Sequence, residues 1–148
     1  MQIRRYRDDD WPEWLRMSLL LDPASPQENH ESDMHATLGN EDAAVFVVER
    51  PNGKLAGYVE VGARGYAEGC MTSPVGYIEA WYVDEDVRRA GLGRSLLEAA
   101  EVWSRSQGYS EIGSDALIDN EVSHHAHVGA GYEVVDRVVQ FRKSLLSS

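Results

Sequence analysis

The chain has 148 residues, of which 43% are hydrophobic and 26% charged, values typical of one globular domain spanning residues 1–148. The net charge of −11 excludes a phosphate-rich partner such as nucleic acid, and it favours a small cationic substrate, although acidity can also serve solubility alone. Cys70 is the single cysteine and no apolar run reaches the roughly 18 residues of a membrane span, so we expect a cytoplasmic protein without membrane contact.

Hydrophobic periodicity, interrupted by Gly, Pro and Asn, predicts alternating strands and helices without a linker or repeat. Strands are predicted at residues 3–7, 44–48, 55–63, 75–83, 111–116 and 132–142. Helices are predicted from the Asp8–Asp10 cluster through Leu19, and at residues 28–38, 91–107 and 120–128. Helices early in the chain and one late strand–helix crossover predict an α+β or α/β sandwich with a mixed sheet.

A glycine-rich turn, Arg88-x-x-Gly91-x-Gly93, stands between the predicted strand 75–83 and the helix that follows. Glycines allow a ligand to approach the backbone, and the first N–H groups of a helix have no partner within the helix. The helix dipole and neighbouring arginines add positive charge suited to phosphate oxygens. The turn therefore predicts a phosphate-binding site.

Two common nucleotide motifs do not fit this turn. A nucleoside-triphosphate loop needs Lys followed by Ser or Thr after its glycines, and the dinucleotide fingerprint needs a third glycine, which is missing here. An ordinary connector between a strand and a helix remains the alternative, because short motifs also occur without function.

The same turn resembles the pyrophosphate-binding signature of the GCN5-related N-acetyltransferases, or GNAT family. The later run from Asp119-Asn120 through His127 to Gly131-Tyr132 resembles the family's late pattern. Within the family, the sequence is similar to the aminoglycoside 6′-N-acetyltransferases, above all in the stretch from Thr72 to Glu79. The resemblance implies the GNAT fold: a mixed, mostly antiparallel sheet whose fourth and fifth strands splay apart, with flanking helices.

The resemblance also implies a site for acetyl-CoA as cosubstrate. Backbone groups of the fourth strand are implied to bind its pantetheine arm, with the Val83 N–H facing the thioester carbonyl, and Asn120 is implied to reach the same region. The implied donor-site residues are Trp81, Tyr82, Val83, Arg88, Arg89, Ala90, Gly91, Leu92, Gly93, Arg94 and Asn120.

On the acceptor side, carboxylates are the physical complement of a substrate with several ammonium groups. Glu79 lies in an apolar strand, where a carboxylate is costly without a partner or cavity, although it could simply face solvent. The resemblance implies that Asp22, Tyr66, Glu79, Asp115 and Asp136 line the acceptor site, Asp136 through a homodimer. Glu79 or Asp115 is also implied to accept the ammonium proton, and His127 to protonate the leaving thiolate.

These residues predict an aminoglycoside 6′-N-acetyltransferase that confers antibiotic resistance by direct acetyl transfer in a ternary complex. Two alternatives stay open: an acetyltransferase of another amine, such as a polyamine, metabolite or peptide N-terminus, and a non-catalytic acyl-CoA-binding module. The five histidines lack the spacing of metal ligands, so no metal site is predicted.

Overall fold

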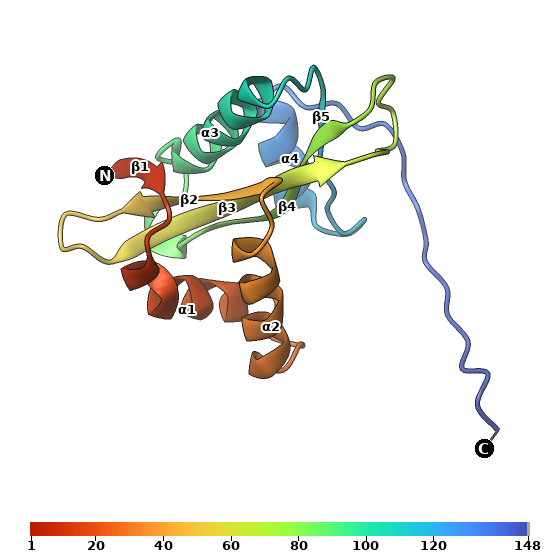
Figure 1. The fold of residues 1–148 in the computed structure, drawn as a ribbon, viewed down its shortest axis with the longest axis horizontal. Coiled ribbons are helices and arrows are strands. Elements are labelled where there is room, and N and C mark those ends of the chain that lie inside the picture. Colours follow the sequence, from red (N-terminus) through yellow and green to blue (C-terminus); the bar gives the residue numbers. More distant parts are fainter. Residues whose placement is uncertain (148) are drawn as a thin grey trace. The chain divides into compact units, whose positions relative to one another are not determined.

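A five-stranded sheet is the frame of residues 1–115 in the computed structural model, which describes residues 1–147 (Figure 1). Its strands follow one another in chain order: β1 (Gln2–Arg5), β2 (Ala43–Glu49), β3 (Leu55–Arg64), β4 (Val75–Val83) and β5 (Ile112–Gly113). All neighbours are antiparallel except β4 and β5, which are parallel. The predicted mixed sheet is confirmed.

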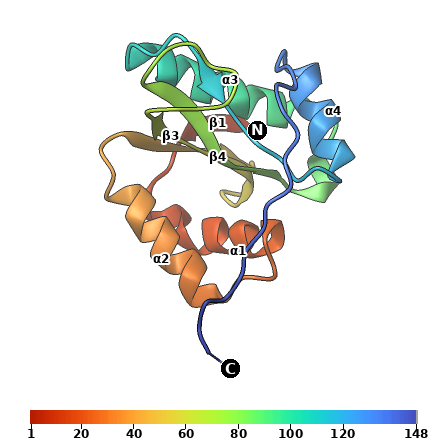
Figure 2. The same ribbon diagram turned by 90° about the vertical axis from the view of Figure 1, so that its right-hand side faces the viewer.

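Helices cover both faces of this sheet. Two helices, α1 (Trp11–Leu21) and α2 (Gln27–Leu38), lie on one face, and α3 (Leu92–Ser106) lies on the other (Figure 2). Short 3₁₀ turns, η1 (Asp8–Asp10) and η2 (Glu85–Val87), precede α1 and α3. A second compact unit begins at residue 116 and contains α4 (Glu121–Gly129).

The core of the first unit has one layer on each face of the sheet. Under α1 and α2, the side chains of Trp14, Met17 and Met34 pack with Tyr58 of β3. On the other face, α3 buries Leu96, Leu97, Ala100 and Trp103, which lie at helical spacing. This apolar periodicity is the signal from which the helix was predicted.

Strand β5 is much shorter than the predicted strand at residues 111–116. Only Ile112 and Gly113 pair with β4. The ring of Tyr77 lies so close to Gly113 that an added Cβ would stand 3.1 Å from it. Beyond this contact the chain leaves the sheet.

The predicted strand at residues 132–142 is wrong for the described chain. Residues 133–147 form neither helix nor strand, and the five-stranded sheet pairs with none of them. Val134, Val135, Val138, Val139 and Phe141 are all more than half exposed. Apolar residues here come in pairs, so they define no single buried face, and a strand also needs a neighbour for its hydrogen bonds.

A buried ion cluster fixes the end of β4. The Asp84 carboxylate, only 7% exposed as a residue, accepts hydrogen bonds from Arg16 of α1 at 2.9 and 3.0 Å and from Arg50 at 3.0 Å. Tyr82 donates a further bond at 3.0 Å. Burial opposes ionisation of Asp84, but these donors outweigh it and hold the pKa of the carboxyl below its usual value.

We expect Asp84→Asn to lower the free energy of unfolding by about 2–3 kcal/mol, because it leaves two guanidinium groups without their shared anion. The measurement is the urea midpoint at neutral pH. Asp86→Asn is the control, since Asp86 also pairs with Arg50 but its side chain is 62% exposed. An equal effect of both substitutions would contradict a special role for the buried carboxylate.

Candidate active site

Strand β4 loses its partner on one edge after its third residue. Pairing with β5 stops after Gly76 and Tyr77, whereas pairing with β3 continues to Val83. From Ile78 onward, the edge away from β3 therefore has no strand beside it in the described sheet. A ligand with amide groups could hydrogen-bond along such an edge as a strand would.

Alternation along the strand determines which backbone groups reach this edge. The Asp84 N–H donates to the Ala56 carbonyl at 2.7 Å, so the backbone of Asp84 faces β3. Because direction alternates, Tyr82 also faces β3, and the N–H and C=O of Val83 face the open edge. The Val83 carbonyl accepts a bond from Arg88 Nε at 2.9 Å. Only the side chain of Tyr82, and not its backbone, is thus available to a ligand.

The turn before α3 has an unusual backbone. Arg89 and Gly91 both have positive φ angles, 69° and 80°. Of the two, Arg89 is the residue with a side chain, for which a positive φ is uncommon. Positive φ on alternate residues tends to direct successive N–H groups to one side, which makes a concave anion site. An added Cβ at Gly91 would meet no atom within 4 Å, so the space beside it is open. Arg88, Arg89 and Arg94 are exposed around this turn.

Gly93 packs closely against Trp81, and its predicted part in phosphate binding stays a prediction for its backbone N–H. An added Cβ there would stand 3.1 Å from the Trp81 ring, and the Trp81 indole N–H donates to the Gly93 carbonyl at 3.1 Å. The second glycine of the motif therefore lets the first turn of α3 lie against β4. The sequence pattern alone did not separate these two roles.

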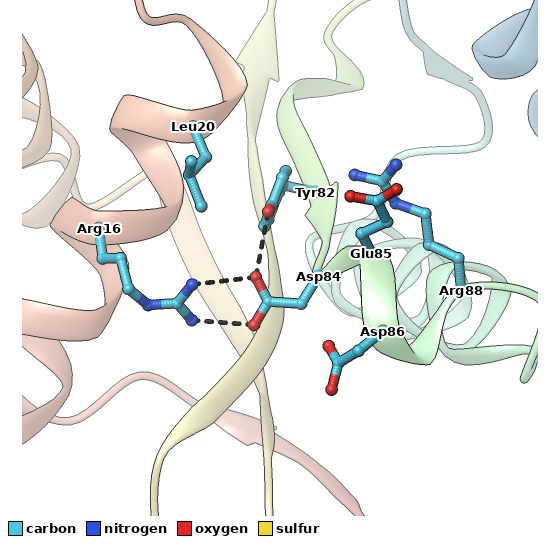
Figure 3. Close-up of a pocket in the computed structure, with 7 residues that line it drawn as sticks. All are labelled: Arg16, Leu20, Tyr82, Asp84, Glu85, Asp86 and Arg88. Carbon is cyan, nitrogen blue, oxygen red and sulfur yellow. Dashed lines mark hydrogen bonds and ion pairs between the residues drawn. The ribbon is translucent and has the colours of Figure 1, made fainter.

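A pocket of about 480 Å³ adjoins the open end of β4 (Figure 3). Its lining comes from α1, β4 and η2 and consists of Arg16, Leu20, Tyr82, Asp84, Glu85, Asp86 and Arg88. In Figure 3, Arg16 and Tyr82 both reach Asp84, so the buried ion cluster forms one wall of the pocket.

A bulge in β4 occurs at Glu79. Glu60 of β3 pairs with Ala80 and Val61 pairs with Ile78, which leaves Glu79 as an extra residue. Glu60 and Glu79 line one cavity of about 190 Å³ together with Thr37 of α2. The bulge thus directs Glu79 to the α2 side of the sheet, where Glu60 also lies.

Glu79 belongs to a chain of contacts that ends at Asp115. Arg64 donates two hydrogen bonds to the Glu79 carboxylate, both at 2.8 Å, and its guanidinium lies 3.6 Å from the centre of the Tyr77 ring. The Tyr77 hydroxyl donates to Asp115 at 2.5 Å. Burial and this bond raise the pKa of Tyr77. The structure therefore brings Glu79 and Asp115 to one region, which we call the acidic face and define as Glu60, Arg64, Tyr77, Glu79 and Asp115.

Glu60, Arg64 and Tyr77 were not predicted as site residues. Burial raises the pKa of Glu60 to about 7, Thr37 and Trp14 oppose this, and the charges of Glu79 and Asp33 add to it. A signal was present in the sequence, because Glu60 is a carboxylate within an apolar strand, as Glu79 is.

The other predicted acceptor residues of the first unit are exposed. Tyr66 lies 67% exposed in the loop between β3 and β4. Glu111 braces this loop by accepting hydrogen bonds from the N–H groups of Met71 and Thr72, at 2.8 and 2.7 Å. Asp22 ends α1, and its carbonyl lies 2.8 Å from Nε2 of the buried His30.

Three predicted residues belong to the second unit. Asn120 begins α4, and its side chain accepts a bond from the Ser123 N–H at 3.2 Å. His127 has Nδ1 2.7 Å from the Ser123 carbonyl, so this nitrogen carries a proton and donates. Asp136 is exposed, and its carboxylate accepts from the Arg137 N–H at 2.7 Å.

Neither a metal site nor a membrane span is found in residues 1–147. No group of His, Cys, Asp and Glu side chains there has the arrangement needed to hold an ion. No helix in that range is long and apolar enough to cross a bilayer.

Residues 3–132 match the model of the Acetyltransferase (GNAT) family, and the chain belongs to this family. The chain is 36% identical to an aminoglycoside N(6′)-acetyltransferase type 1 of Klebsiella aerogenes, over 97% of this chain and 96% of the relative. It is also 36% identical to the enzyme of that name from Stenotrophomonas maltophilia, over 97% of this chain and 93% of the relative.

Solved structures agree with this assignment. An aminoglycoside 6′-N-acetyltransferase of Acinetobacter haemolyticus superposes with a TM-score of 0.90 at 30% identity, covering 98% of this chain and 99% of that one. A second, AAC(6′)-Iy in complex with the bisubstrate analogue CoA-S-monomethyl-acetylneamine, has a TM-score of 0.89 at 28% identity, with 97% of each chain covered. The predicted family and fold are confirmed.

The residues present fit acetyl-CoA, the acetyl donor of this family. The turn from Arg88 to Gly91 offers a concave backbone, open space and exposed cations to a pyrophosphate. The β4 edge offers the Val83 backbone to an amide-containing arm.

We expect Gly91→Val to weaken acetyl-CoA binding at least tenfold, because a branched side chain would fill the open space and strain the turn. Binding is measured by calorimetry on the folded variant. Gly108→Val is the matched control, since Gly108 also has a positive φ, 90°, and open space around its Cβ position. Gly108 differs from Gly91 in its place, because it follows the C-terminal end of α3. Equal acetyl-CoA affinity of the two variants would contradict the phosphate site.

Proposed function

We propose that this chain is an aminoglycoside 6′-N-acetyltransferase, which transfers the acetyl group of acetyl-CoA to the 6′-amine of kanamycin- and neomycin-type antibiotics. The observation that carries the proposal is the acidic face, which adjoins the half of β4 that has an open edge. Similarity over nearly the whole chain to enzymes of this name supports the same substrate class.

On the donor side, acetyl-CoA supplies an activated acetyl group as a thioester. The chain binds and orients this donor through the Arg88–Gly91 turn and the open edge of β4. The Val83 N–H faces that edge and is the candidate donor to the carbonyl oxygen as negative charge develops on it. Fixed donors of this kind need no reorganisation during the reaction.

On the acceptor side, the carboxylates of Glu79 and Asp115 bind ammonium groups of the substrate and orient the amine. Arg64 neutralises Glu79 in the absence of substrate, through a pair whose two side chains are 44% and 42% exposed. An exposed pair of this kind is weak, so an ammonium group can share Glu79 with Arg64 or displace it. The amine must lose its proton before attack, to a carboxylate, to water, or in solution before binding.

Two alternatives remain distinguishable by experiment. An acetyltransferase of another amine would release CoA with a polyamine or peptide and not with kanamycin. A non-catalytic acyl-CoA module would bind acetyl-CoA without releasing CoA with any amine. Kanamycin-dependent CoA release, followed with a thiol reagent, therefore tests the proposal directly.

We further propose that the protein acts as a homodimer in which residues 132–142 pair with another copy. The exposed apolar side chains from Val134 to Phe141 are the reason, because an unpaired extended segment of this composition readily adds to a sheet edge. Asp136 would then serve the partner's acceptor site. Sedimentation at micromolar concentration should give twice 16.5 kDa, and a single 16.5 kDa species would refute the dimer.

Neomycin should be a good substrate, whereas paromomycin, which carries a hydroxyl in place of the 6′-amine, should have a kcat/KM lower by about a hundredfold or more. A hydroxyl is the weaker nucleophile and offers no positive charge to Glu79 or Asp115. The measurement is the initial rate of CoA release at matched concentrations. If paromomycin reacts as fast as neomycin, acetylation takes place at another position.

A further inference from the structure

Glu60 is a carboxylate without a cation. It lies in the middle of β3, between the buried side chains of Val59 and Val61, and pairs with Ala80 of β4. Thr37 of α2 donates a hydrogen bond to its Oε1 at 3.2 Å. No Arg, Lys or His among residues 1–147 pairs with it. A partly buried carboxylate without a cation destabilises the fold, which points to a role in binding.

The cavity beside Glu60 has room for part of a substrate. Its volume is about 190 Å³. Glu79 lines it as well, together with Thr37 of α2 and Asn40, which follows α2. A water molecule occupies about 30 Å³ in the liquid, so the cavity can hold an amino group together with its neighbouring ring carbons. The cavity belongs to the acidic face, and the bulge at Glu79 is what opens β4 toward it.

Arg64 does not compensate Glu60, because its ion pair and both hydrogen bonds of that pair go to Glu79. The two carboxylates of the cavity therefore differ: Glu79 has a cation in the free enzyme and Glu60 has none. A ligand that brings a positive charge gains more from Glu60, since it need not displace an existing partner.

We propose that Glu60 is a specificity-determining residue that binds a second ammonium group of the acceptor, separate from the amine that is acetylated. This inference rests on the proposed function, because it assumes a substrate with several amines bound at the acidic face. Glu60 would orient the sugar rings and select polycationic acceptors over simple monoamines.

Binding of an ammonium group should also expel a proton from Glu60. The free carboxyl is partly protonated near pH 7, because burial and the charges of Glu79 and Asp33 disfavour its ionised form. The other groups around it do not titrate near this pH: Thr37 on α2, Trp14 on α1, Tyr58 on its own strand and Val45, its neighbour on β2. A bound cation favours the carboxylate and lowers its pKa, so proton release accompanies binding.

The kinetic test compares Glu60→Gln and Glu60→Asp with wild type. We expect Glu60→Gln to raise KM for kanamycin about tenfold with little change in kcat, and Glu60→Asp to recover part of the loss because it keeps the charge. Asp9→Asn is the control, because Asp9 is exposed in η1 and its substitution removes one negative charge from the surface. Unchanged KM in Glu60→Gln would overturn the inference.

A second readout does not depend on turnover. Calorimetry of kanamycin binding at pH 7, in two buffers of different ionisation enthalpy, counts the protons exchanged. We expect wild type to release about half a proton more per site than Glu60→Gln, a difference that vanishes at pH 8.5. Amines that bind away from Glu60 change their protonation equally in both proteins and cancel. Equal proton counts at pH 7 would contradict the proposal.

Failure of this inference differs from failure of the proposed function. If the chain does not act on aminoglycosides, wild type itself neither binds kanamycin nor releases CoA with it. If only the role of Glu60 is wrong, wild type acetylates kanamycin and Glu60→Gln does so with the same KM and proton count. Retained acetyl-CoA affinity and an unchanged melting profile in Glu60→Gln exclude misfolding as the cause of any loss.

Discussion

The unequal pairing of the two edges of β4 is the constraint on which both halves of the site depend. On one edge β4 stays bonded to β3 over its whole length, at the expense of a bulge at Glu79. On the other it pairs with β5 only through Tyr77. The bulge directs a carboxylate toward the α2 side, and the lost pairing frees the Val83 backbone for a ligand. One irregular strand thus supplies the acceptor and the donor positions.

The carboxylates at the end of β4 and near its middle differ in how far cations compensate their charge. At the end, Asp84 is buried and satisfied by two arginines and a tyrosine, which fixes β4 to α1 and to the β2–β3 hairpin just before the glycine-rich turn. In the middle, Glu79 of β4 and the neighbouring Glu60 of β3 have between them one exposed guanidinium. The charge of Asp84 is thus compensated and fixed, whereas part of the negative charge of Glu60 and Glu79 is not compensated. A polycationic substrate supplies the missing positive charge.

The sequence was sufficient to predict the elements that depend on a local pattern of residues. The span of β4 and the start of α3 follow from apolar runs and from Gly91, and residue periodicity alone suffices for them. The bulge could not be predicted, because a one-residue slip depends on how β3 pairs with β4. Glu60 stood out as a carboxylate in an apolar strand, but only this pairing places it beside Glu79. The strand at residues 132–142 was predicted from composition, but pairing is a property of the neighbour and not of the segment. The packing of Gly93 against Trp81 could not be predicted, because the motif does not reveal the ring behind it.

The hydrogen bond of His127 determines which of its ring nitrogens could take part in proton transfer. Its Nδ1 donates to the Ser123 carbonyl, so the proton on this nitrogen is not the one that the ring could give to a leaving group. Only the imidazolium could give a proton from Nε2, whereas the neutral ring of α4 can only accept one there. The role of His127 as the acid for the leaving thiolate therefore stays a prediction, and it requires a proton on Nε2. In the proposed function, selectivity depends on where the carboxylates of the acidic face hold the ammonium groups, and rate depends on how accurately the backbone of β4 is presented to the reacting carbonyl.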